Sequence, residues 1–387
     1  MRRQTAILLF LAHLLVFAFS ACSNKSAHNS ENSAYNDTIY APQYATGFAI
    51  RGDKTKASTI IETYNPWQGA QDIENSLFIA RNGEMPPTGF KGQILKNGAN
   101  RIVAMSSTHV AMLDRLGACD RITGISGKDY VNSGNVRSNL DYIYEVGYEG
   151  NINYENIIAA NPDIVLLYGV NGASSMEGKL KELGIPYIYI GDYLEESPLG
   201  KTEWMIVLAE LIGKKDSGIK ELQATASRYN GLKGKAASVT HRPTVMLNAP
   251  YGDSWMVAPG GSYISTIIRD AGGKYVYDNI KGNVSKAIDL EEAYTTTASA
   301  DFWLNAGNFT TLRELQSALP KFSETKPVLN KHVYSNNLRT NANGGNDYFE
   351  SAIVNPDIVL GDVMRILHPE IMQDPDSLVY YRHLEDI

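Results

Sequence analysis

One short pattern occurs twice in this chain and constrains its fold more than any other feature. In each copy an Asn or Asp is followed two residues later by Glu, then by a short helical segment. An Asp then opens an apolar strand. The copies span residues 153–169 and 289–307. The Asn or Asp stands where a helix N-cap is favoured. The repeat predicts two similar α/β lobes facing each other across a cleft, an arrangement typical of ligand-binding proteins.

Residues 1–21 are expected to be an export signal and not part of the fold. Arg2 and Arg3 precede an apolar run from Ala6 to Phe19, and small residues then lead to Cys22. This order is typical of a secretory signal, and the run is shorter than the ~20 residues that span a bilayer. A cysteine after a small pair resembles the lipidation motif of bacterial lipoproteins, with Phe19 in place of the usual leucine. We expect a lipid on Cys22, with plain secretion as the alternative.

Composition excludes one class of partner and indicates how the cysteines are used. The chain has 35 Lys and Arg against 42 Asp and Glu, a net charge of −7. An acidic balance argues against nucleic acid as a partner. Lipidation of Cys22 would leave Cys119 as the only other cysteine. We therefore expect no internal disulfide, and Cys119 is interpreted as a small packed residue.

The order of predicted elements divides the chain into segments. A tether over residues 22–40 and a β-rich extension over 41–100 come first, the latter with strands at 46–50, 58–64 and 77–80. Strands and helices alternate from residue 101, which predicts mainly parallel pairing with helices on the sheet faces. The predicted strands lie at 101–105, 121–125, 163–168 and 186–190. The predicted boundaries are an N-lobe at 101–197, linking helices at 198–238 and a C-lobe at 239–387.

Helical periodicity predicts a long connector and a divided terminal helix. Residues 216–235 carry one apolar stripe, and a helix of about 20 residues is about 30 Å long, enough to bridge two lobes. The last helix is expected from about 347 to 367, with Pro356 kinking or splitting it. The hexapeptide Asn-Pro-Asp-Ile-Val-Leu occurs at 161–166 and at 355–360. Its flanking residues predict a strand for the first copy and a helix for the second.

Several short segments match a known family in their order and spacing: Arg101–Ser106, Leu113–Gly117, Ile122–Ser126, Asn153–Ile157, Asn161–Leu166 and Leu183–Pro186. Together they resemble the substrate-binding proteins of ABC importers for bulky metal chelates, which include ferric-siderophore, haem and vitamin B12 carriers. The resemblance implies an α/β fold of two Rossmann-like lobes joined by a long helix. It also implies a monomer with the ligand between the lobes, and an ABC permease and ATPase as partners. The stretch after Cys22 has no acidic run, so we expect the anchored protein to face the periplasm.

The resemblance gives the repeated glutamates a role. In this family one Glu on each lobe docks onto arginines of the permease. The matching residues are Glu155 in the N-lobe and Glu291 in the C-lobe, with Glu292 as the alternative register. Exposed opposite charges orient docking and speed encounter. A Glu is also favoured at the positive end of a helix for purely structural reasons.

The ligand is expected to contact loops at the strand ends that face the cleft. The candidate ligand-binding residues are Tyr130, Tyr148, Tyr168, Trp255, Asp347, His109 and Asn308, and the same loops carry Asn171, Asn305 and Asn337. The four aromatic residues fall where the B12-binding member of the family has aromatic residues, and the segment 347–350 resembles its Asp-aromatic-Phe-Glu segment. These resemblances favour a corrinoid, with a ferric siderophore or haem as the alternative.

Other chemistries have weaker support in the sequence. His109 could be an axial ligand to haem iron, although a packing histidine is the favoured interpretation. The scattered histidines predict no bare-metal site, and we expect no cofactor. The chain lacks the Gly-x-Ser-x-Gly, phosphate-loop and His-Glu-x-x-His motifs, so we do not expect an enzyme. A cell-envelope enzyme or a structural lipoprotein on the same fold remains the alternative of a different class.

Overall fold

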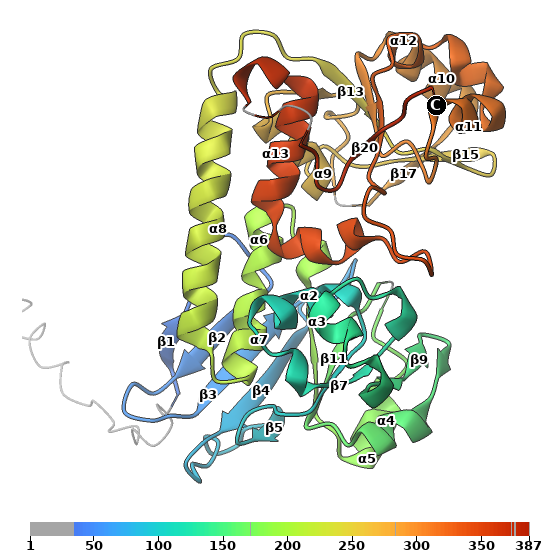
Figure 1. The fold of residues 1–387 in the computed structure, drawn as a ribbon. Helices are drawn as coiled ribbons and strands as arrows, with labels where there is room; N and C mark the ends of the chain where they lie inside the picture. The colour runs from blue at the N-terminus through green and yellow to red at the C-terminus, as the bar shows by residue number, and fades with distance from the viewer. Residues whose placement is uncertain (1–34, 171, 283, 373, 375–376, 387) are drawn as a thin grey trace, which may run out of the picture.

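The computed structural model describes residues 35–170, 172–282, 284–372, 374 and 377–386. The expected signal, Cys22 and Asn171 lie outside these residues. Figure 1 shows two lobes, one above the other, with long helices along one side and an N-terminal sheet beside the lower lobe. In the described part of the chain, no helix combines the length and apolar character that crossing a membrane requires.

The lower lobe, the N-lobe, is built on a parallel sheet of five strands in the order β12-β11-β6-β7-β8. The strands are β6 (Ile102–Ala104), β7 (Ile122–Ile125), β8 (Tyr144–Glu145), β11 (Ile164–Leu167) and β12 (Tyr187–Tyr189). Its helices are α2 (Ser107–Arg115), α3 (Gly134–Arg137), α4 (Tyr154–Ala160) and α5 (Glu177–Leu183), and a β9 (Gly147–Tyr148) and β10 (Asn151–Ile152) hairpin precedes α4. The predicted parallel sheet is confirmed, and of its five strands only the short edge strand β8 was not predicted.

The upper lobe, the C-lobe, has a sheet in the order β16-β13-β18-β19-β20, with β20 antiparallel at the edge. Its strands are β13 (Thr244–Leu247), β16 (Lys274–Tyr275), β18 (Phe302–Leu304), β19 (Val333–Ser335) and β20 (Arg382–His383). A small antiparallel sheet contains β14 (Pro250–Tyr251), β15 (Ser254–Val257) and β17 (Lys286–Asp289). The helices are α9 (Tyr263–Asp270), α10 (Leu290–Ser299), α11 (Leu312–Ala318) and α12 (Lys326–Leu329).

The N-terminal extension forms its own five-stranded sheet in the order β1-β2-β3-β4-β5. The strands are β1 (Asp37–Tyr40), β2 (Phe48–Gly52), β3 (Thr59–Tyr64), β4 (Glu74–Ala80) and β5 (Gln93–Lys96). The end of the segment expected to be a tether is therefore strand β1. Buried residues of the extension, such as Phe48 and Ile61, belong to the same hydrophobic cluster as Leu113 and Ile206 of the N-lobe region.

Buried carboxylates also fasten the extension to the helices behind it. Glu203 is fully buried and accepts hydrogen bonds from the Tyr40 hydroxyl and from the backbone N–H groups of residues 43–45, at 2.6–2.8 Å. Glu195 accepts from the backbone N–H groups of Thr46 and Gly47 and from the indole of Trp204. Because buried polar groups need such partners, these bonds fix the position of the extension.

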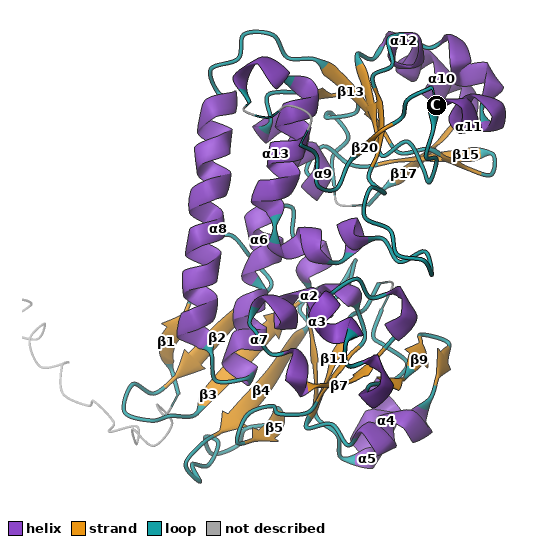
Figure 2. Ribbon diagram, viewed as in Figure 1, coloured by secondary structure: helices purple, strands orange, loops and turns teal. Residues whose placement is uncertain are grey.

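Within the described residues, three stretches of chain connect the lobes. The first contains α6 (Pro198–Glu203), α7 (Met205–Leu211) and α8 (Lys215–Ala236). Helix α8 has 22 residues and is roughly 33 Å long. Its Leu222 packs in the N-lobe core, whereas Tyr229 packs in the C-lobe core. Figure 2 shows α8 and α13 running between the two strand-containing lobes.

The C-terminal part of the chain provides the other two connections. From β19 it descends through η6 (Asp347–Phe349) to η7 (Ser351–Val354), where Ile353 and Val354 join the N-lobe core. Helix α13 (Pro356–Leu367) then returns to pack in the C-lobe core. Pro356 is in the first turn of α13, where its missing N–H is harmless. The predicted division of the terminal helix at Pro356 is confirmed. The strand predicted for the first hexapeptide copy and the helix predicted for the second are confirmed as β11 and α13.

The strand-opening aspartates of the repeated pattern have equivalent roles. Asp163 precedes β11, and its carboxylate accepts from the backbone N–H groups of Asn100 and Arg101 at 2.7 and 2.9 Å. Asp301 precedes β18, and its carboxylate accepts from the backbone N–H and hydroxyl of Thr244 at 2.7 and 2.8 Å. Each aspartate therefore ties its strand to the first strand of its own lobe.

Candidate functional site

A cavity of about 410 Å³ lies between the two lobes, and we call it the cleft cavity. The N-lobe lines it with Thr108 and residues 192–196, and the C-lobe with Asn248, residues 262–264 and Asn305. The descending C-terminal segment and α6 complete the lining with Tyr348, Phe349, Ala352, Ile353 and Lys201. The volume falls within the range of about 300–1,000 Å³ that is usual for small-ligand sites.

Sheet topology explains why these residues converge. In the C-lobe sheet, β13 lies between β16 and β18. The chain therefore adds β16 on one side of β13 and later adds β18 on the other side, which makes β13 a topological switch point. Asn248 follows β13 and Asn305 follows β18, so the two flank this switch point. Both adopt left-handed backbone, with φ of 70° and 55°, which Asn tolerates better than most residues. Open α/β sheets bind ligands beyond the carboxyl ends of strands at such points.

Two residues that line the cleft cavity each have a polar side-chain atom without a hydrogen-bond partner among the described residues. Asn305 Oδ1 and Tyr263 Oη are buried and have no hydrogen-bond partner among the described residues. Lys201 Nζ donates to the Tyr193 carbonyl at 3.2 Å and lies 5.5 Å from the centre of the Tyr263 ring. Both unpaired atoms are covered by protein, so the surfaces that the cavity offers to a ligand are the Tyr263 ring, the Lys201 side chain and the other lining groups.

Burial perturbs the two charged groups at the base of the cleft cavity. Asp192 is only 3% exposed, and burial raises the pKa of its carboxyl to about 6, although Lys201 nearby opposes the rise. Burial lowers the pKa of the Lys201 ammonium, with Asp192 and Glu195 opposing that change. Perturbed groups in a cleft are characteristic of functional sites.

Trp255, which was predicted to contact the ligand, lies in the C-lobe core. It is fully buried on β15, and its indole N–H donates to the Leu247 carbonyl at 2.9 Å. Its ring packs 5.5 Å from Trp303 and 5.4 Å from Phe322, measured between ring centres. Side chains alternate across a strand, and this one faces the C-lobe core and not the cleft.

His109 and Asp347 are also placed differently from the prediction. His109 lies on the inner face of α2 with no exposed surface, and burial lowers its pKa to about 3, so the ring is neutral. His109 is not among the residues that line the three cavities. This position supports the interpretation as a packing histidine and disfavours the interpretation as a haem ligand. Asp347 is buried and bonded to Arg339 Nε at 2.9 Å and to the Ser351 hydroxyl at 2.8 Å. Its neighbour Tyr348 lines the cleft cavity instead.

The remaining predicted ligand residues lie outside the cleft cavity. Tyr130 and Tyr148 line a separate cavity on the N-lobe, and Tyr168 packs partly buried against the N-lobe core. Asn308 is exposed. Among the predicted loop residues, Asn305 does line the cleft cavity, whereas Asn337 bonds the Phe309 carbonyl.

Sequence reasoning missed most of the residues that line the cleft cavity, including Tyr193, Lys201, Asn248 and Tyr263. One usable signal was present for Asn248. It follows an apolar strand directly, as Asn305 does, and the two strands pair in parallel. Lys201 and Tyr263 belong to α6 and α9, whose sequences read as ordinary helix starts.

The repeated glutamates occupy equivalent positions. Glu155 is the second residue of α4 and Glu291 the second residue of α10, and both are exposed. The N-cap side chains Asn153 and Asp289 accept from first-turn backbone N–H groups at 2.8–3.0 Å. Both helices lead into a strand that pairs with the first strand of its lobe. Position therefore matches Glu155 with Glu291 and not with Glu292.

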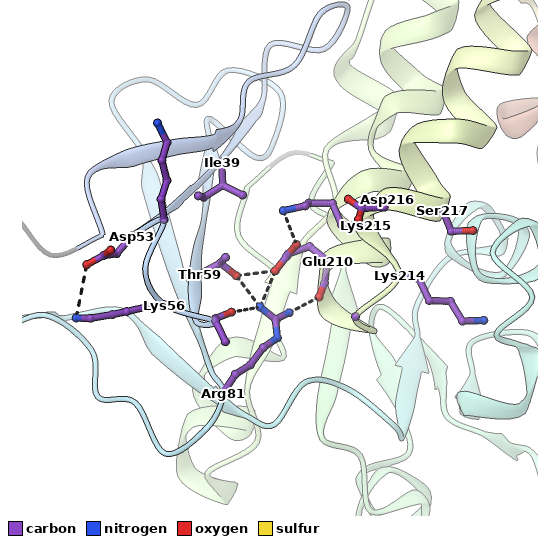
Figure 3. A pocket seen from close by; sticks show the side chains of 13 residues that line it. Ile39, Asp53, Lys56, Thr59, Arg81, Glu210, Lys214, Lys215, Asp216 and Ser217 are labelled. Carbon is purple, nitrogen blue, oxygen red and sulfur yellow. Dashed lines mark hydrogen bonds and ion pairs between the residues drawn. The ribbon is translucent and has the colours of Figure 1, made fainter.

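A third cavity, of about 740 Å³, lies between the extension and the loop joining α7 to α8. Figure 3 shows Asp53 paired with Lys56, and Glu210 paired with Arg81 and Lys215. Buried Glu210 bonds Arg81 Nη1 at 2.8 Å and the Thr59 hydroxyl at 2.7 Å, and Lys215 Nζ lies 3.8 Å from it. The Arg81 guanidinium also donates to the Glu210 carbonyl at 2.8 Å. Arg81, Thr59 and Glu210 join the extension to the helices by bonding one another. We therefore interpret this cavity as structural and not as a ligand site.

Metal and thiol chemistry have little support in the described part of the chain. No cluster of three or more His, Cys, Asp or Glu there could hold a metal ion. Cys119 Sγ donates to Asp114 Oδ1 at 3.1 Å. Burial, reinforced by Asp114, raises the pKa of this thiol to about 12. The group is therefore a protonated, unreactive thiol at neutral pH.

Comparison with known proteins gives the fold and the family. An uncharacterized lipoprotein of Methanocaldococcus jannaschii is 24% identical over 331 residues, covering 79% of this chain and 77% of its own. A periplasmic binding protein from Veillonella parvula superposes with a TM-score of 0.59 at 13% identity, covering 81% of this chain and 99% of that one. A periplasmic haem-binding protein from Pseudomonas aeruginosa gives a TM-score of 0.57 at 14% identity, covering 73% and 97%.

The structural likenesses are below 25% identity and show the shared fold of two α/β lobes. Family membership rests on the sequence itself. A model of the periplasmic binding proteins matches residues 102–337, more than half of the chain and most of both lobes. This chain therefore belongs to the periplasmic binding protein family, whose members are solute-binding components of ABC importers.

Proposed function

We propose that this protein is the substrate-binding lipoprotein of an ABC importer that captures a metal chelate in the cleft cavity. One observation carries the proposal: the cavity lies at the strand ends of both lobes, and aromatic side chains line it beside a few polar groups, among them Lys201 and Asn305. Delivery would use Glu155 and Glu291 as docking points for a permease coupled to an ATPase. The protein would act as a carrier and not as an enzyme.

Charge narrows the class of ligand. The cleft cavity is lined by Asp192, Glu195 and Glu196 and by a single cation, Lys201. An acidic site disfavours polyanionic ligands, because like charges brought together in a desolvated cavity repel. A neutral or weakly charged chelate with amide groups fits best, which keeps a corrinoid as the first candidate. A ferric siderophore of low charge or haem is the second, and the likeness to a haem-binding protein from Pseudomonas aeruginosa supports it.

Three of the aromatic residues that favoured a corrinoid lie outside the cleft cavity. Trp255 is in the C-lobe core, and Tyr130 and Tyr148 line a separate cavity. The aromatic residues that line the cleft cavity are Tyr193, Tyr263, Tyr348 and Phe349. These rings still offer stacking surfaces to a flat, partly apolar ligand. The ligand proposal therefore rests on charge and on these four residues.

The proposed location is the periplasmic side of a cell-envelope membrane, where a lipid on Cys22 would anchor the protein. The order of residues 1–22 supports it, as does a lipoprotein among the relatives. Replacing Cys22→Ala should release the protein in soluble form, measured by fractionating cells. Persistent membrane association would argue against lipidation.

A titration tests the ligand. The purified mature protein would be titrated with cyanocobalamin, haem and a set of ferric siderophores, with intrinsic fluorescence as the readout. Saturable binding to one class is expected, and Phe349→Ala should weaken it about fivefold, because the side chain lines the cleft cavity, is 61% exposed and offers a stacking surface. Tyr251→Ala, at a residue 88% exposed on β14, is the matched control and should bind normally. Failure of all three ligand classes to bind would contradict the carrier proposal.

A further inference from the structure

Most of the N-lobe side of the cleft cavity comes from one continuous segment, residues 187–203, which we call the wall segment. It contains β12, η4 (Asp192–Leu194) and α6. Six of the residues that line the cleft cavity belong to it: Asp192, Tyr193, Leu194, Glu195, Glu196 and Lys201. Strand β12 is at the edge of its sheet, beside β11. A segment that leaves an edge strand has sheet neighbours on one side only, so its position depends on what covers the other side.

The N-terminal extension covers that other side and bonds the wall segment at both of its ends. At the β12 end, Gln93 Nε2 donates to the Tyr187 carbonyl at 2.8 Å, and Gln93 Oε1 accepts from the Tyr187 N–H at 3.0 Å. Gln93 therefore satisfies backbone groups at the open edge of the N-lobe sheet. At the α6 end, Glu203 accepts from the backbone N–H groups of residues 43–45.

Between these ends, the extension holds Glu195, which lines the cleft cavity. The Glu195 carboxylate accepts from the N–H groups of Thr46 and Gly47 at 2.9 and 3.1 Å, and from the Trp204 indole at 3.0 Å. The backbone also approaches the Trp204 ring closely, since a Cβ would lie 2.6 Å from it at Gly47 and 3.0 Å from it at Gly191. Glycine at both positions allows the extension and the wall segment to close on one buried tryptophan.

The extension also holds Tyr193, whose side chain belongs to the aromatic lining of the cleft cavity. The Tyr193 hydroxyl accepts from the Gln68 N–H at 3.1 Å and donates to the Gly169 carbonyl. The neighbouring Trp67 packs on the same glycine, where an added Cβ would lie 3.2 Å from the Trp67 Cβ. The Trp67 ring centre is 5.4 Å from that of Tyr189 on β12. Trp67 thus supports the wall segment, although it lines none of the three cavities.

We propose that the extension is a working part of the ligand site, because it fixes the Tyr193 ring and the Glu195 carboxylate in the wall of the cleft cavity. Trp67 is then a positioning residue that raises affinity for the chelate without touching it. This inference rests on the proposed function. The family model begins at residue 102, so the extension lies outside the part of the chain that the model describes. A preformed wall lowers the ordering cost of binding.

Two truncations in the extension test the inference. Calorimetric titration would use cyanocobalamin, or whichever of haem and the ferric siderophores the wild-type protein binds, with each variant shown to be folded by circular dichroism. Trp67→Ala should weaken binding about fivefold, because the wall segment would then be ordered only when the ligand binds. Trp67→Phe should recover most of the loss. Unchanged affinity in Trp67→Ala would overturn the inference.

The matched control is Phe90→Ala, which also removes an aromatic side chain from the extension. The Phe90 ring centre is 6.0 Å from that of Phe78, in a hydrophobic cluster whose members lie between residues 35 and 90. This variant should be destabilised like Trp67→Ala but should keep its affinity. An equal loss of affinity in both variants would overturn the inference, because general destabilisation would then account for the effect.

Hydrogen exchange separates this inference from the proposed function, because it needs no ligand. In the ligand-free protein, Trp67→Ala should speed exchange about tenfold over residues 190–195 and leave α9 of the C-lobe unchanged. The N–H groups of Ile190, Leu194 and Glu195 bond nearby carbonyls and report on this segment. Unchanged exchange there would overturn the inference even if a chelate binds. Wild-type protein that binds none of the chelates would contradict the proposed function, whereas faster exchange at 190–195 would still support the positioning role of Trp67.

Discussion

The two lobes use one framework for different purposes. In both, a capped helix with Glu at its second position leads to an aspartate that ties the following strand to the first strand of the lobe. The N-lobe adds a five-stranded extension and a cavity walled by tyrosines. The C-lobe adds a small antiparallel sheet whose Trp255 is enclosed in the core, whereas Tyr251 of the same sheet is exposed. The shared pattern therefore specifies the scaffold, whereas the additions decide which aromatic residues reach the surface.

The largest expected effect comes from emptying the aromatic core of the C-lobe. Trp255→Ala should lower the free energy of unfolding by about 3–5 kcal/mol, because it leaves a cavity beside Trp303 and Phe322. Tyr148→Ala, at the exposed tyrosine of the N-lobe, should cost less than about 1 kcal/mol. Chemical denaturation of both variants measures the contrast. A small loss for Trp255→Ala would mean that the tryptophan is not a core residue.

The next effect concerns the attachment of the extension. Glu203→Gln replaces a buried carboxylate that accepts four hydrogen bonds, so we expect a loss of about 2–3 kcal/mol. Hydrogen exchange should accelerate in β1 and β2 and remain unchanged in the C-lobe. Glu196→Gln, at an exposed glutamate, is the control. Uniformly faster exchange in both lobes would show that the extension is not a separate unit of stability.

Asp192 is expected to make stability depend on pH. Its folded-state pKa of about 6 lies above the ordinary 3.8, so the fold favours the protonated carboxyl. The cost of ionising it is absent below about pH 4 and fully present above about pH 6. Asp192→Asn should therefore be more stable than wild type by on the order of 2 kcal/mol at pH 7.5, and equally stable at pH 4. Denaturant titrations at both pH values measure this, and a difference that does not change with pH would contradict it.

The smallest effect compares the two strand-tying aspartates. Asp301 also bonds Lys326 Nζ at 2.6 Å. Burial opposes the change, but the bonds from Lys326 and Thr244 lower its pKa to about 2. Asp301→Asn should therefore cost about 1 kcal/mol more than Asp163→Asn at pH 7. The difference should shrink as pH falls from about 4 to about 2, because the carboxyl then takes up a proton in the unfolded chain before it does so in the folded protein. An equal cost at neutral pH would make the two ties equivalent.

The fold was largely predictable from the sequence because its signals are local. Ser106 before α2, Ser262 before α9 and Gly272 after α9 mark helix ends by their own chemistry. The two hexapeptide copies show where local sequence stops being sufficient. Identical residues form β11 and the start of α13, and only their flanks distinguish them.

The cleft was less predictable because its residues meet through tertiary packing. Trp255 follows a loop in the sequence, but which face of β15 points inward depends on the small sheet around it. Tyr348 reaches the cleft and Asp347 does not, because Arg339 and Ser351 hold the aspartate away. Lys201 becomes a lining residue only once α6 is packed between the lobes. No periodicity in the sequence encodes these placements.

The descent of the C-terminal segment to the N-lobe has a consequence for biosynthesis. Ile353 and Val354 complete a core whose other members are contributed by residues 45–222. A chain made from its N-terminus therefore contains no finished lobe until nearly all of it has been synthesised. Both lobes then close together, late, around the same final segment. The export signal expected at residues 1–21 would benefit from this order, because the polypeptide would stay unfolded while it passes through a membrane channel.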